Sequence, residues 1–356
     1  MAVSFSIIIP VFNAERYLQG CIDTLMYQLE NDDEVILVND GSGDNSRDIC
    51  IDIAKRYPQS VCYIEQENKG ASVARNTGLS AAGKDYVLFI DSDDQVKQNY
   101  LSLLRSKLTN IQNIDVLMFG YETIPNGQVF YPGFSEGIKK TRHELLMENQ
   151  AINRNNDFCF VWRFAVKRSY IKDNDFKFDE DVSIGEDYLF NARVLLSGGL
   201  IYVMREALYM YRINNADSTM SKKYKPDLEK QLLVQYNKKL EIIEQYSLRS
   251  VPGWGYDFSW YYITAFRDML FKNIYNSDEK DKIRGLRRVL SLSLITDNYR
   301  TVGTKYWRYS KKEAVLHFCC KYRVFLRYVY YRIKKAYSQI SLKKKVLRKL
   351  IKISKL

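Results

Sequence analysis

The sequence has few of the residues from which zinc sites are built. It contains only two histidines, and none of its six cysteines forms a C-x-x-C pair. These counts disfavour a zinc site made of Cys and His. Cys21 and Cys50 fall near the apolar faces of predicted helices, and Cys62 falls in a predicted strand. We therefore expect buried free thiols in a reducing cytoplasm.

Long apolar runs and two common nucleotide-binding loops are also missing. No stretch of 18 or more apolar residues occurs, which predicts no transmembrane helix. The apolar residues Ile7–Ile9 lack a basic lead and a small-residue cleavage site, so they indicate a first strand rather than a signal peptide. A G-x-x-x-x-G-K-S/T loop is absent, and so is a G-x-G-x-x-G loop after the first strand. Kinases and dehydrogenases of the usual kinds are therefore disfavoured.

Acidic residues are almost absent from the C-terminal end. From Lys305 onward there are 17 Lys and Arg residues and one acid, Glu313, whereas the first 304 residues carry 37 basic and 41 acidic residues. The net charge of +12 therefore belongs to this tail. Any anionic surface partner is predicted to bind there.

The first 120 residues do contain a clear alternation of strand and helix patterns. Continuous apolar runs such as Ser6–Val11 alternate with helical spacing such as that of Ala14–Leu29, and Ser46 is predicted to cap the next helix. This alternation predicts βαβ units and a mostly parallel sheet that is covered on both faces. Ligands of such sheets bind beyond the carboxyl ends of the strands. The loops of interest therefore follow Val11, Val38, Ile64 and Ile90.

Each of these four loops carries a cluster of polar residues. The clusters are Asn13 with Glu15, Asn39–Asp44, Asn68–Gly70 followed by Arg75, and Asp91–Asp94. Taken singly, the second is also a common turn, and the third also suits a plain helix start. In the fourth, alternate residues point the same way, so two carboxylates can converge on Mg²⁺ or Mn²⁺; a solvated acidic turn is the alternative. Together, on one sheet edge, the clusters indicate a site for a nucleotide, a diphosphate and a metal.

These segments resemble the family 2 glycosyltransferases of the GT-A fold. The matching segments, in the family's order, are IIIPVFNAERYL (Ile7–Leu18), VNDGSGDNS (Val38–Ser46), NKGASVARNTGL (Asn68–Leu79), FIDSDD (Phe89–Asp94) and GEDYLF (Gly185–Phe190). The resemblance implies an α/β nucleotide-diphospho-sugar transferase with a Rossmann-like, mostly parallel sheet. The predicted organisation is a GT-A catalytic domain over residues 1–220, a helical region over 221–304 and a basic amphipathic tail over 305–356.

The resemblance implies roles for residues on the donor side. Asp40 contacts the base, Lys69 and Arg75 lie near the phosphates, and Asp93 binds Mn²⁺ or Mg²⁺, which neutralises the leaving diphosphate. Many relatives place a histidine in the segment that matches 211–220, where this sequence has Asn214, Asn215 and Asp217, so the third protein ligand stays open. Tyr211, Arg212 and Ser218 are expected to close over the diphosphate. The full set of implied nucleotide-sugar-binding residues is Pro10, Val11, Asn13, Glu15, Asp40, Lys69, Arg75, Asp91 and Ser92.

The resemblance also implies roles on the acceptor side. Asp187 is the general base, Glu186 beside it positions the sugar or the acceptor, and Trp162 and Arg163 face the acceptor. One base suffices for a single displacement with inversion. Acids are also common in the first turn of any helix, so an ordinary helix start is the alternative for Asp187.

The predicted function is therefore inverting transfer of a hexose or N-acetylhexosamine from a nucleotide-diphosphate donor. The resemblance favours UDP over GDP and dTDP, and it favours a glycan or polyprenyl-linked acceptor in bacterial surface-polysaccharide synthesis. A non-catalytic sugar-nucleotide or glycan-binding protein is the alternative. A nucleotidyltransferase is disfavoured because residues 13–15 are not a Gly-rich basic loop.

The basic tail contains apolar residues at helical spacing. We expect it to lie in the headgroup region of an anionic membrane, with the enzyme on the cytoplasmic side. Packing on the catalytic domain is the alternative, and a dimer contact through residues 225–304 stays open. Nucleic acid is disfavoured because no reader motif occurs. The apolar residues at this spacing are Val315, Phe318, Tyr322, Leu326, Val329 and Ile333, then Leu342, Val346, Leu350 and Ile353.

Overall fold

The structure, a computed structural model, describes residues 3–213, 224–308 and 311–336. The chain divides into two compact units. The first comprises Met1–Ala216 and Asn237–Pro252, and the second comprises Asp217–Tyr236 and Gly253–Leu356. The long helix α8 (Leu228–Gln245) therefore contributes residues to both units.

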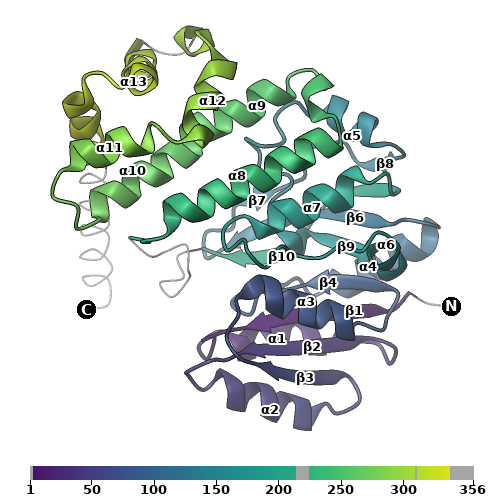
Figure 1. Ribbon diagram of the computed structural model, residues 1–356. Coiled ribbons are helices and arrows are strands. Elements are labelled where there is room, and N and C mark those ends of the chain that lie inside the picture. Colours follow the sequence, from purple (N-terminus) through teal and green to yellow (C-terminus); the bar gives the residue numbers. More distant parts are fainter. Residues whose placement is uncertain (1–2, 214–223, 309–310, 337–356) are drawn as a thin grey trace. The chain divides into compact units, whose positions relative to one another are not determined.

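A ten-stranded sheet runs through the described part of the first unit (Figure 1). Its main path is β3-β2-β1-β4-β9-β6-β10-β5, with β7 beside β6 and β8 beside β10. Strands β1 to β4 pair in parallel, as do β6 and β10, whereas β9 is antiparallel to both of its neighbours. The predicted mostly parallel α/β sheet is confirmed. The strands are β1 (Phe5–Val11), β2 (Glu34–Asp40), β3 (Val61–Gln66), β4 (Tyr86–Phe89), β5 (Gln95–Val96), β6 (Val116–Ile124), β7 (Val129–Phe130), β8 (Gly137–Lys139), β9 (Phe164–Lys167) and β10 (Ile201–Arg212).

The central strands β1, β2 and β4 are almost entirely buried because helices cover both faces of the sheet. Ile8 of β1 is fully buried between Ile36 of β2 and Phe89 of β4 in the strand register. Helix α3 approaches β1 closely: a Cβ at Gly78 would lie 2.3 Å from Ile8 Cγ2, so a larger residue would force the two apart. The helices of this unit are α1 (Leu18–Met26), α2 (Ser46–Arg56), α3 (Ala71–Ala81), α4 (Tyr100–Asn110), α5 (Arg142–Glu148), α6 (Arg168–Asp173) and α7 (Glu186–Leu196).

Three local details differ from the sequence expectations. The helix expected over Ala14–Leu29 is shorter, because α1 begins only at Leu18 and ends at Met26. Ser46 does not cap α2: it is the first residue of that helix, and its hydroxyl accepts a hydrogen bond from the Ala14 N–H (2.7 Å). Cys62 is exposed rather than buried, because β3 is the last strand of the sheet path. The six cysteines, all within described residues, are free thiols as predicted.

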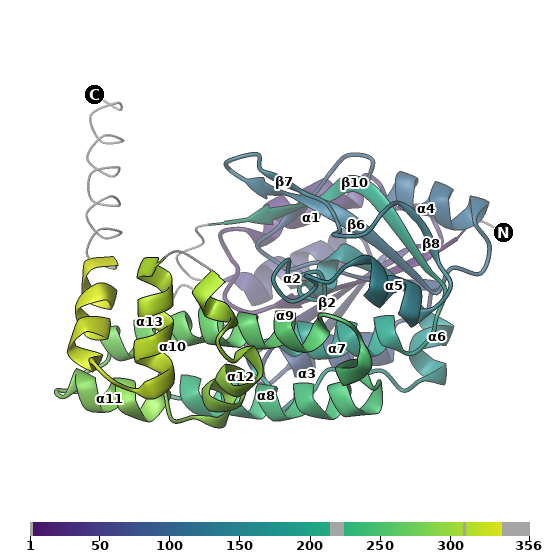
Figure 2. The ribbon, with the colours of Figure 1, turned by 90° about the horizontal axis from the view of Figure 1, so that it is seen from above.

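The described part of the second unit is helical (Figures 1 and 2). Two helices are expected over residues 256–304, but three helical stretches are found there. The first runs without a break through a π-helical turn, and Asp281 starts the second by accepting hydrogen bonds from the N–H groups of Ile283 (3.1 Å) and Arg284 (3.0 Å). The elements are α9 (Trp254–Tyr261), the π-helical turn Tyr262–Phe266, α10 (Arg267–Asn276), α11 (Lys282–Val289), α12 (Ser293–Val302), a 3₁₀ turn (Lys305–Arg308) and α13 (Lys311–Tyr322).

A buried polar group ties three of these helices together. His317 Nδ1 of α13 lies 3.2 Å from Nη1 of Arg267 on α10 and 3.1 Å from the hydroxyl of Tyr299 on α12. Burial and the neighbouring Arg267 lower the pKa of His317 to about 3, so this histidine is neutral near pH 7. His317 is therefore a packing element of this unit. Among the described residues, no helix has both the length and the apolar character needed to cross a membrane.

The apolar stripe expected from Val315 to Ile333 is broken in the structure. Arg323 and Phe325 adopt left-handed backbone conformations (φ 55° and 50°) between α13 and a further helix over residues 326–336. As a result, the first three members of the stripe are exposed and the last three are buried. The second predicted stripe, over 342–353, lies outside the described residues.

Candidate active site

The carboxyl ends of β1, β2, β3 and β4 lie at the same edge of the sheet because these strands are parallel. Asp91–Asp94, which we call the acidic segment, follow β4 and are held at this edge by residues of β10. The Tyr209 hydroxyl accepts a hydrogen bond from the Asp91 N–H (3.0 Å) and donates one to the carboxylate of Asp94 (2.8 Å). The backbone N–H of Arg212 donates a hydrogen bond to the carboxylate of Asp94 (2.6 Å), and its side-chain Nε donates one to the carbonyl of Asp93 (2.8 Å). Asp94 is thereby buried and fully engaged, while Asp91 and Asp93 remain half-buried at the edge.

One guanidinium connects this segment to the start of α7. Arg75 of α3 has a side chain only 5% exposed and contacts three carboxylates. Its Nη2 donates to Asp91 (3.1 Å), and its Nη1 donates to Glu186 (3.1 Å) and Asp187 (2.9 Å). We call these four residues the Arg75 cluster. It brings together residues more than 100 positions apart in the sequence.

The electrostatics of the Arg75 cluster follow from burial and from its excess of negative charge. Burial raises the pKa of Asp91 to about 6, although Arg75 opposes the rise. Burial and the adjacent Asp187 also raise the pKa of Glu186, again against the effect of Arg75. Burial disfavours the charge of Arg75 itself, but the three carboxylates outweigh it and raise the pKa of Arg75. The guanidinium is therefore permanently charged, and the cluster holds three acids around one cation.

Asp187 occupies the first turn of α7 in a fixed orientation. The helix begins after Gly185, whose φ of 79° suits glycine. One carboxylate oxygen of Asp187 accepts from Arg75, and the other accepts from the backbone N–H of Val161 (3.2 Å). Each carboxylate oxygen can accept more than one hydrogen bond, and the side chain is 17% exposed. Asp187 therefore keeps room to accept a further hydrogen bond from a bound hydroxyl group.

The loops after β1, β2 and β3 are joined by side-chain to backbone hydrogen bonds. Asn13 accepts from the Gly43 N–H (2.8 Å), and Glu15 accepts from the Asn45 N–H (3.1 Å) at the start of α2. The buried Asp40 accepts from the N–H groups of Lys69 and Gly70, both at 2.9 Å. These bonds fix the three loops to one another and leave the side chain of Lys69 exposed at the edge.

The comparisons with known proteins agree with this geometry. The family model for glycosyl transferase family 2 matches residues 6–174. The chain is 30% identical over 323 residues to the uncharacterised glycosyltransferase EpsJ of Bacillus subtilis, and the match covers 90% of this chain and 92% of EpsJ. This chain belongs to glycosyltransferase family 2. The predicted family is thereby confirmed.

Two further matches of this glycosyltransferase are to a longer protein and to a solved structure of lower identity. It is 30% identical over 216 residues to the minor teichoic acid biosynthesis protein GgaA of Bacillus subtilis, and it covers only 47% of that protein. Its fold matches the crystal structure of residues 1–349 of TarS from Staphylococcus aureus in complex with UDP-GlcNAc. That match has a TM-score of 0.65 and 20% identity, and it covers 94% of this chain and 92% of that one. The GT-A fold expected from the sequence is confirmed.

The structure shows where the implied donor residues of this glycosyltransferase lie. Pro10 and Ser92 are half-buried at the strand ends, and Lys69 is exposed. Val11 is fully buried in the core, so only its backbone is available to a nucleobase. Arg75, expected near the phosphates, has its guanidinium on the three carboxylates of its cluster instead. Asn214, Asn215, Asp217 and Ser218 lie outside the described residues.

The two residues expected to face the acceptor are buried. Trp162 is 1% exposed and stacks on Tyr209, with ring centroids 4.2 Å apart. Arg163 is 2% exposed, and its Nε donates to the carbonyl of Phe119 (3.3 Å). Trp162 therefore packs on the tyrosine that holds the acidic segment, and Arg163 fixes the backbone of β6.

Sequence reasoning missed two residues that the structure places at the site. Tyr209 holds the acidic segment, and no local motif marks it because its partners are over 100 residues away. Arg212, which the sequence placed over the diphosphate, holds the same segment through Asp94 and the Asp93 carbonyl. Phe12 is 49% exposed between the buried Val11 and the loop-joining Asn13. The sequence did offer one signal for Phe12: an aromatic residue stands where the apolar strand β1 ends and the polar loop begins. Such a ring can stack on a nucleobase.

Replacing Arg75 with Met is expected to destabilise the protein by about 3–5 kcal/mol, because buried carboxylates lose their counter-charge. Without Arg75, the already raised pKa of Glu186 rises further. An acid with a raised folded-state pKa loses stability as pH rises through that pKa, so the variant should regain stability between pH 8 and pH 5. Urea unfolding at both pH values measures this change. The control is Arg56→Met, which removes an exposed surface pair with Asp52; an Arg75 variant as stable as this control would contradict the prediction.

Proposed function

We propose that this family 2 glycosyltransferase transfers a hexose or N-acetylhexosamine from a UDP-sugar with inversion, using a divalent metal ion and Asp187 as the base. The observation that carries the proposal is the Arg75 cluster. Through one guanidinium, it joins Asp91 of the acidic segment to Glu186 and Asp187 at the start of α7. A donor site and a proton acceptor are thereby held at a fixed separation, as a single displacement requires.

The proton-transfer step uses a carboxylate that is already oriented. Val161 and Arg75 hold both oxygens of Asp187, so the side chain cannot rotate away from an incoming hydroxyl group. As the acceptor oxygen attacks the anomeric carbon, the bond from that carbon to the phosphate oxygen breaks, UDP leaves with the electron pair, and the hydroxyl proton passes to Asp187. Glu186 shares the same guanidinium nitrogen, and it is placed to position the acceptor or the transferred sugar by hydrogen bonding.

The carboxylate oxygens of the acidic segment are suitable ligands for a hard cation, and the diphosphate of the sugar nucleotide helps to bind that cation. Asp91 and Asp93 offer carboxylate oxygens, which Mg²⁺ and Mn²⁺ prefer. In the part of the chain that the structure describes, no group of three or more His, Cys, Asp or Glu side chains is arranged to hold a metal ion. We therefore assign Asp93 as the metal-binding residue, with Asp91 directed to the ribose or sugar and the remaining ligands from the donor diphosphate. When bound, the metal stabilises the charge that develops on the leaving diphosphate.

Recognition of the uridine falls to the loops after β1 and β2. Phe12 offers an exposed ring for stacking on the base, and Asp40 is the last residue of the neighbouring strand β2. The TarS structure with the same fold was solved with UDP-GlcNAc bound, which supports a UDP-sugar over GDP or dTDP sugars here. Lys69, exposed and held by its backbone to Asp40, is placed to reach the phosphates.

We further propose that the acceptor is a glycan or a polyprenyl-linked glycan of a bacterial surface polysaccharide, used on the cytoplasmic side of the membrane. The support is the similarity to GgaA, which is named for minor teichoic acid biosynthesis. A homodimer contact through the helical region remains a prediction.

A donor panel tests the proposed function. Binding of UDP-, GDP- and dTDP-sugars is measured by calorimetry with and without Mn²⁺, and slow donor hydrolysis is followed by proton NMR. We expect a UDP-sugar to bind and to turn over only with metal, and the first product to carry the anomeric configuration opposite to that of the donor. A retained configuration would refute inversion. Failure of every sugar nucleotide to bind under any metal condition would refute the enzyme assignment in favour of a non-catalytic protein.

A further inference from the structure

Helix α13 is apolar on two sides, although only one of them is covered. One side packs into the second unit through Ala314, His317 and Cys320, which are 2% exposed or less. The other side leaves Val315 41%, Phe318 36% and Tyr322 50% exposed, at the spacing of one helix face. A helix that only packed on its own unit would carry polar residues on this outer side.

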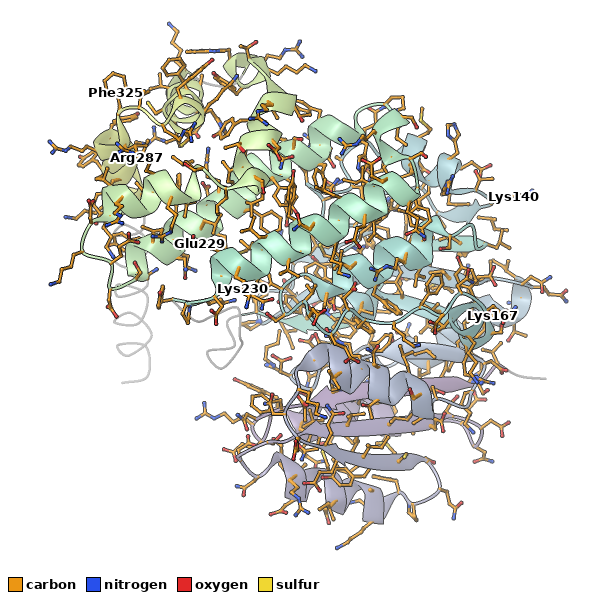
Figure 3. The ribbon with its side chains drawn as sticks, in the orientation of Figure 1. Lys140, Lys167, Glu229, Lys230, Arg287 and Phe325 are labelled. Carbon is orange, nitrogen blue, oxygen red and sulfur yellow. The ribbon has the colours of Figure 1, made fainter. Side chains whose placement is uncertain are left out.

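Three exposed rings on this side lie next to one another. The Phe318 ring centroid lies 4.8 Å from that of Tyr322 and 6.3 Å from that of Trp307, which is itself 53% exposed. Phe325, just beyond α13, is 73% exposed, and Figure 3 labels it at the outer edge of this unit. We call Trp307, Val315, Phe318, Tyr322 and Phe325 the aromatic surface.

The helix over residues 326–336 lies beside α13 (Figures 1 and 2). Arg332 joins the two helices through its ion pair with Glu313 (3.0 Å). Leu326, Val329 and Ile333 are buried, while Tyr328 and Tyr331 are 37% and 61% exposed. The left-handed backbone at Arg323 and Phe325 therefore divides the apolar stripe into an exposed half on α13 and a buried half on the next helix.

The stretch of chain that carries the aromatic surface is strongly basic. Residues 305–336 contain ten Lys and Arg and one acid, Glu313, which pairs with Arg332. The exposed basic side chains in this stretch include Lys305, Arg308, Lys311, Arg323, Arg327 and Lys334. A partner that covers this surface must therefore combine an apolar layer with negative charge.

We propose that the aromatic surface and the basic residues around it bind an anionic phospholipid bilayer. Trp and Tyr rings favour the headgroup level of a bilayer, and nearby Lys and Arg are attracted to anionic headgroups. A second copy of the chain would place like charges against each other, which disfavours self-association through this face. Single-stranded nucleic acid also suits aromatic and basic residues, but the aliphatic side chain of Val315, 41% exposed on the same face, favours an apolar layer. The inference does not depend on the proposed sugar transfer, and its test uses no sugar nucleotide.

Vesicle flotation of the full chain tests the proposal. The vesicles contain phosphatidylcholine alone or mixed with phosphatidylglycerol. The aromatic variant carries Trp307→Ser, Tyr322→Ser and Phe325→Ser together, and the charge variant carries Arg323→Gln and Arg327→Gln together. We expect binding to the anionic vesicles only. The aromatic variant should bind at least about tenfold more weakly because three rings no longer enter the interface. The charge variant should bind roughly 25-fold more weakly, at about fivefold for each basic residue.

Matched controls separate this surface from general effects. Tyr27→Ser removes an aromatic ring that is 60% exposed in the first unit, and Lys140→Gln/Lys172→Gln removes two exposed basic residues there. Both controls should bind like the natural protein, and all variants should keep its melting temperature. Equal binding to neutral vesicles would overturn the proposal, and so would unchanged binding by the aromatic variant. Binding to a single-stranded oligonucleotide in place of vesicles, or a dimer that only the aromatic variant loses, would overturn it in favour of those partners.

Discussion

Replacing Asp187 with Asn is expected to lower the rate of sugar transfer by about a thousandfold, because general-base catalysis contributes 10²–10⁴-fold. The amide has no basic oxygen to take the acceptor proton at neutral pH. Its single acceptor oxygen can satisfy either Arg75 or the Val161 N–H but not both, so we also expect a modest loss of stability, about 1–3 kcal/mol. Single-turnover transfer measures the rate, and urea unfolding measures the stability.

Donor binding distinguishes a chemical role of Asp187 from a structural one. The side chain lies at the start of α7, whereas the nucleotide loops follow β1 to β3, so the variant should bind the UDP-sugar with nearly unchanged affinity. The control Asp181→Asn removes an exposed carboxylate from the segment that precedes α7 and should transfer sugar normally. A variant at Asp187 that keeps most of its transfer rate would show that another group takes the proton.

The architecture of the first unit was accessible from sequence because its signals are local. Apolar runs such as Ser6–Val11 mark strands that are buried on both faces, and the polar clusters after them mark the carboxyl edge of the sheet. Antiparallel β9 was not predicted, because its four residues carry no feature that specifies the direction of pairing. Strand direction here depends on the chain's path through α5 and the segment around residue 160.

The site was predicted in its residues but not in its contacts. The motifs marked Arg75, Asp91 and Asp187 separately, whereas their common guanidinium depends on a long-range contact between α3 and α7. Trp162 and Arg163 show the opposite limit: each residue was placed by its motif at the acceptor, yet each is buried among aromatic and backbone partners. A motif therefore identifies a position in the fold more securely than it identifies what the side chain contacts.

Burial in the C-terminal helices could not be predicted from periodicity. The spacing of Val315, Phe318 and Tyr322 continues into Leu326, Val329 and Ile333 without a mark in the sequence. The left-handed backbone at Arg323 and Phe325 breaks this register, and neither residue is a glycine that would have signalled it. The tertiary packing of the second unit therefore decides which half of the stripe is exposed.

Replacing Asp93 with Asn is expected to weaken Mn²⁺-dependent binding of the donor by about a hundredfold, because a neutral amide oxygen replaces a charged carboxylate ligand of a hard cation. The backbone of the acidic segment should stay in place, because Arg212 contacts the Asp93 carbonyl and Tyr209 holds the neighbouring Asp91 and Asp94. Calorimetric titration of the UDP-sugar, with Mn²⁺ and with a chelator, measures the effect.

The decisive quantity for Asp93 is the difference between these two titrations. In the natural protein, the metal should tighten donor binding strongly; in the variant, the two titrations should nearly coincide, because the diphosphate alone cannot retain the ion at the sheet edge. The control Glu67→Gln removes an exposed carboxylate from the loop after β3 and should preserve the full effect of the metal. If Mn²⁺ tightens donor binding equally in the natural protein and the Asp93 variant, the ion is held elsewhere, and the acidic segment serves to position the sugar.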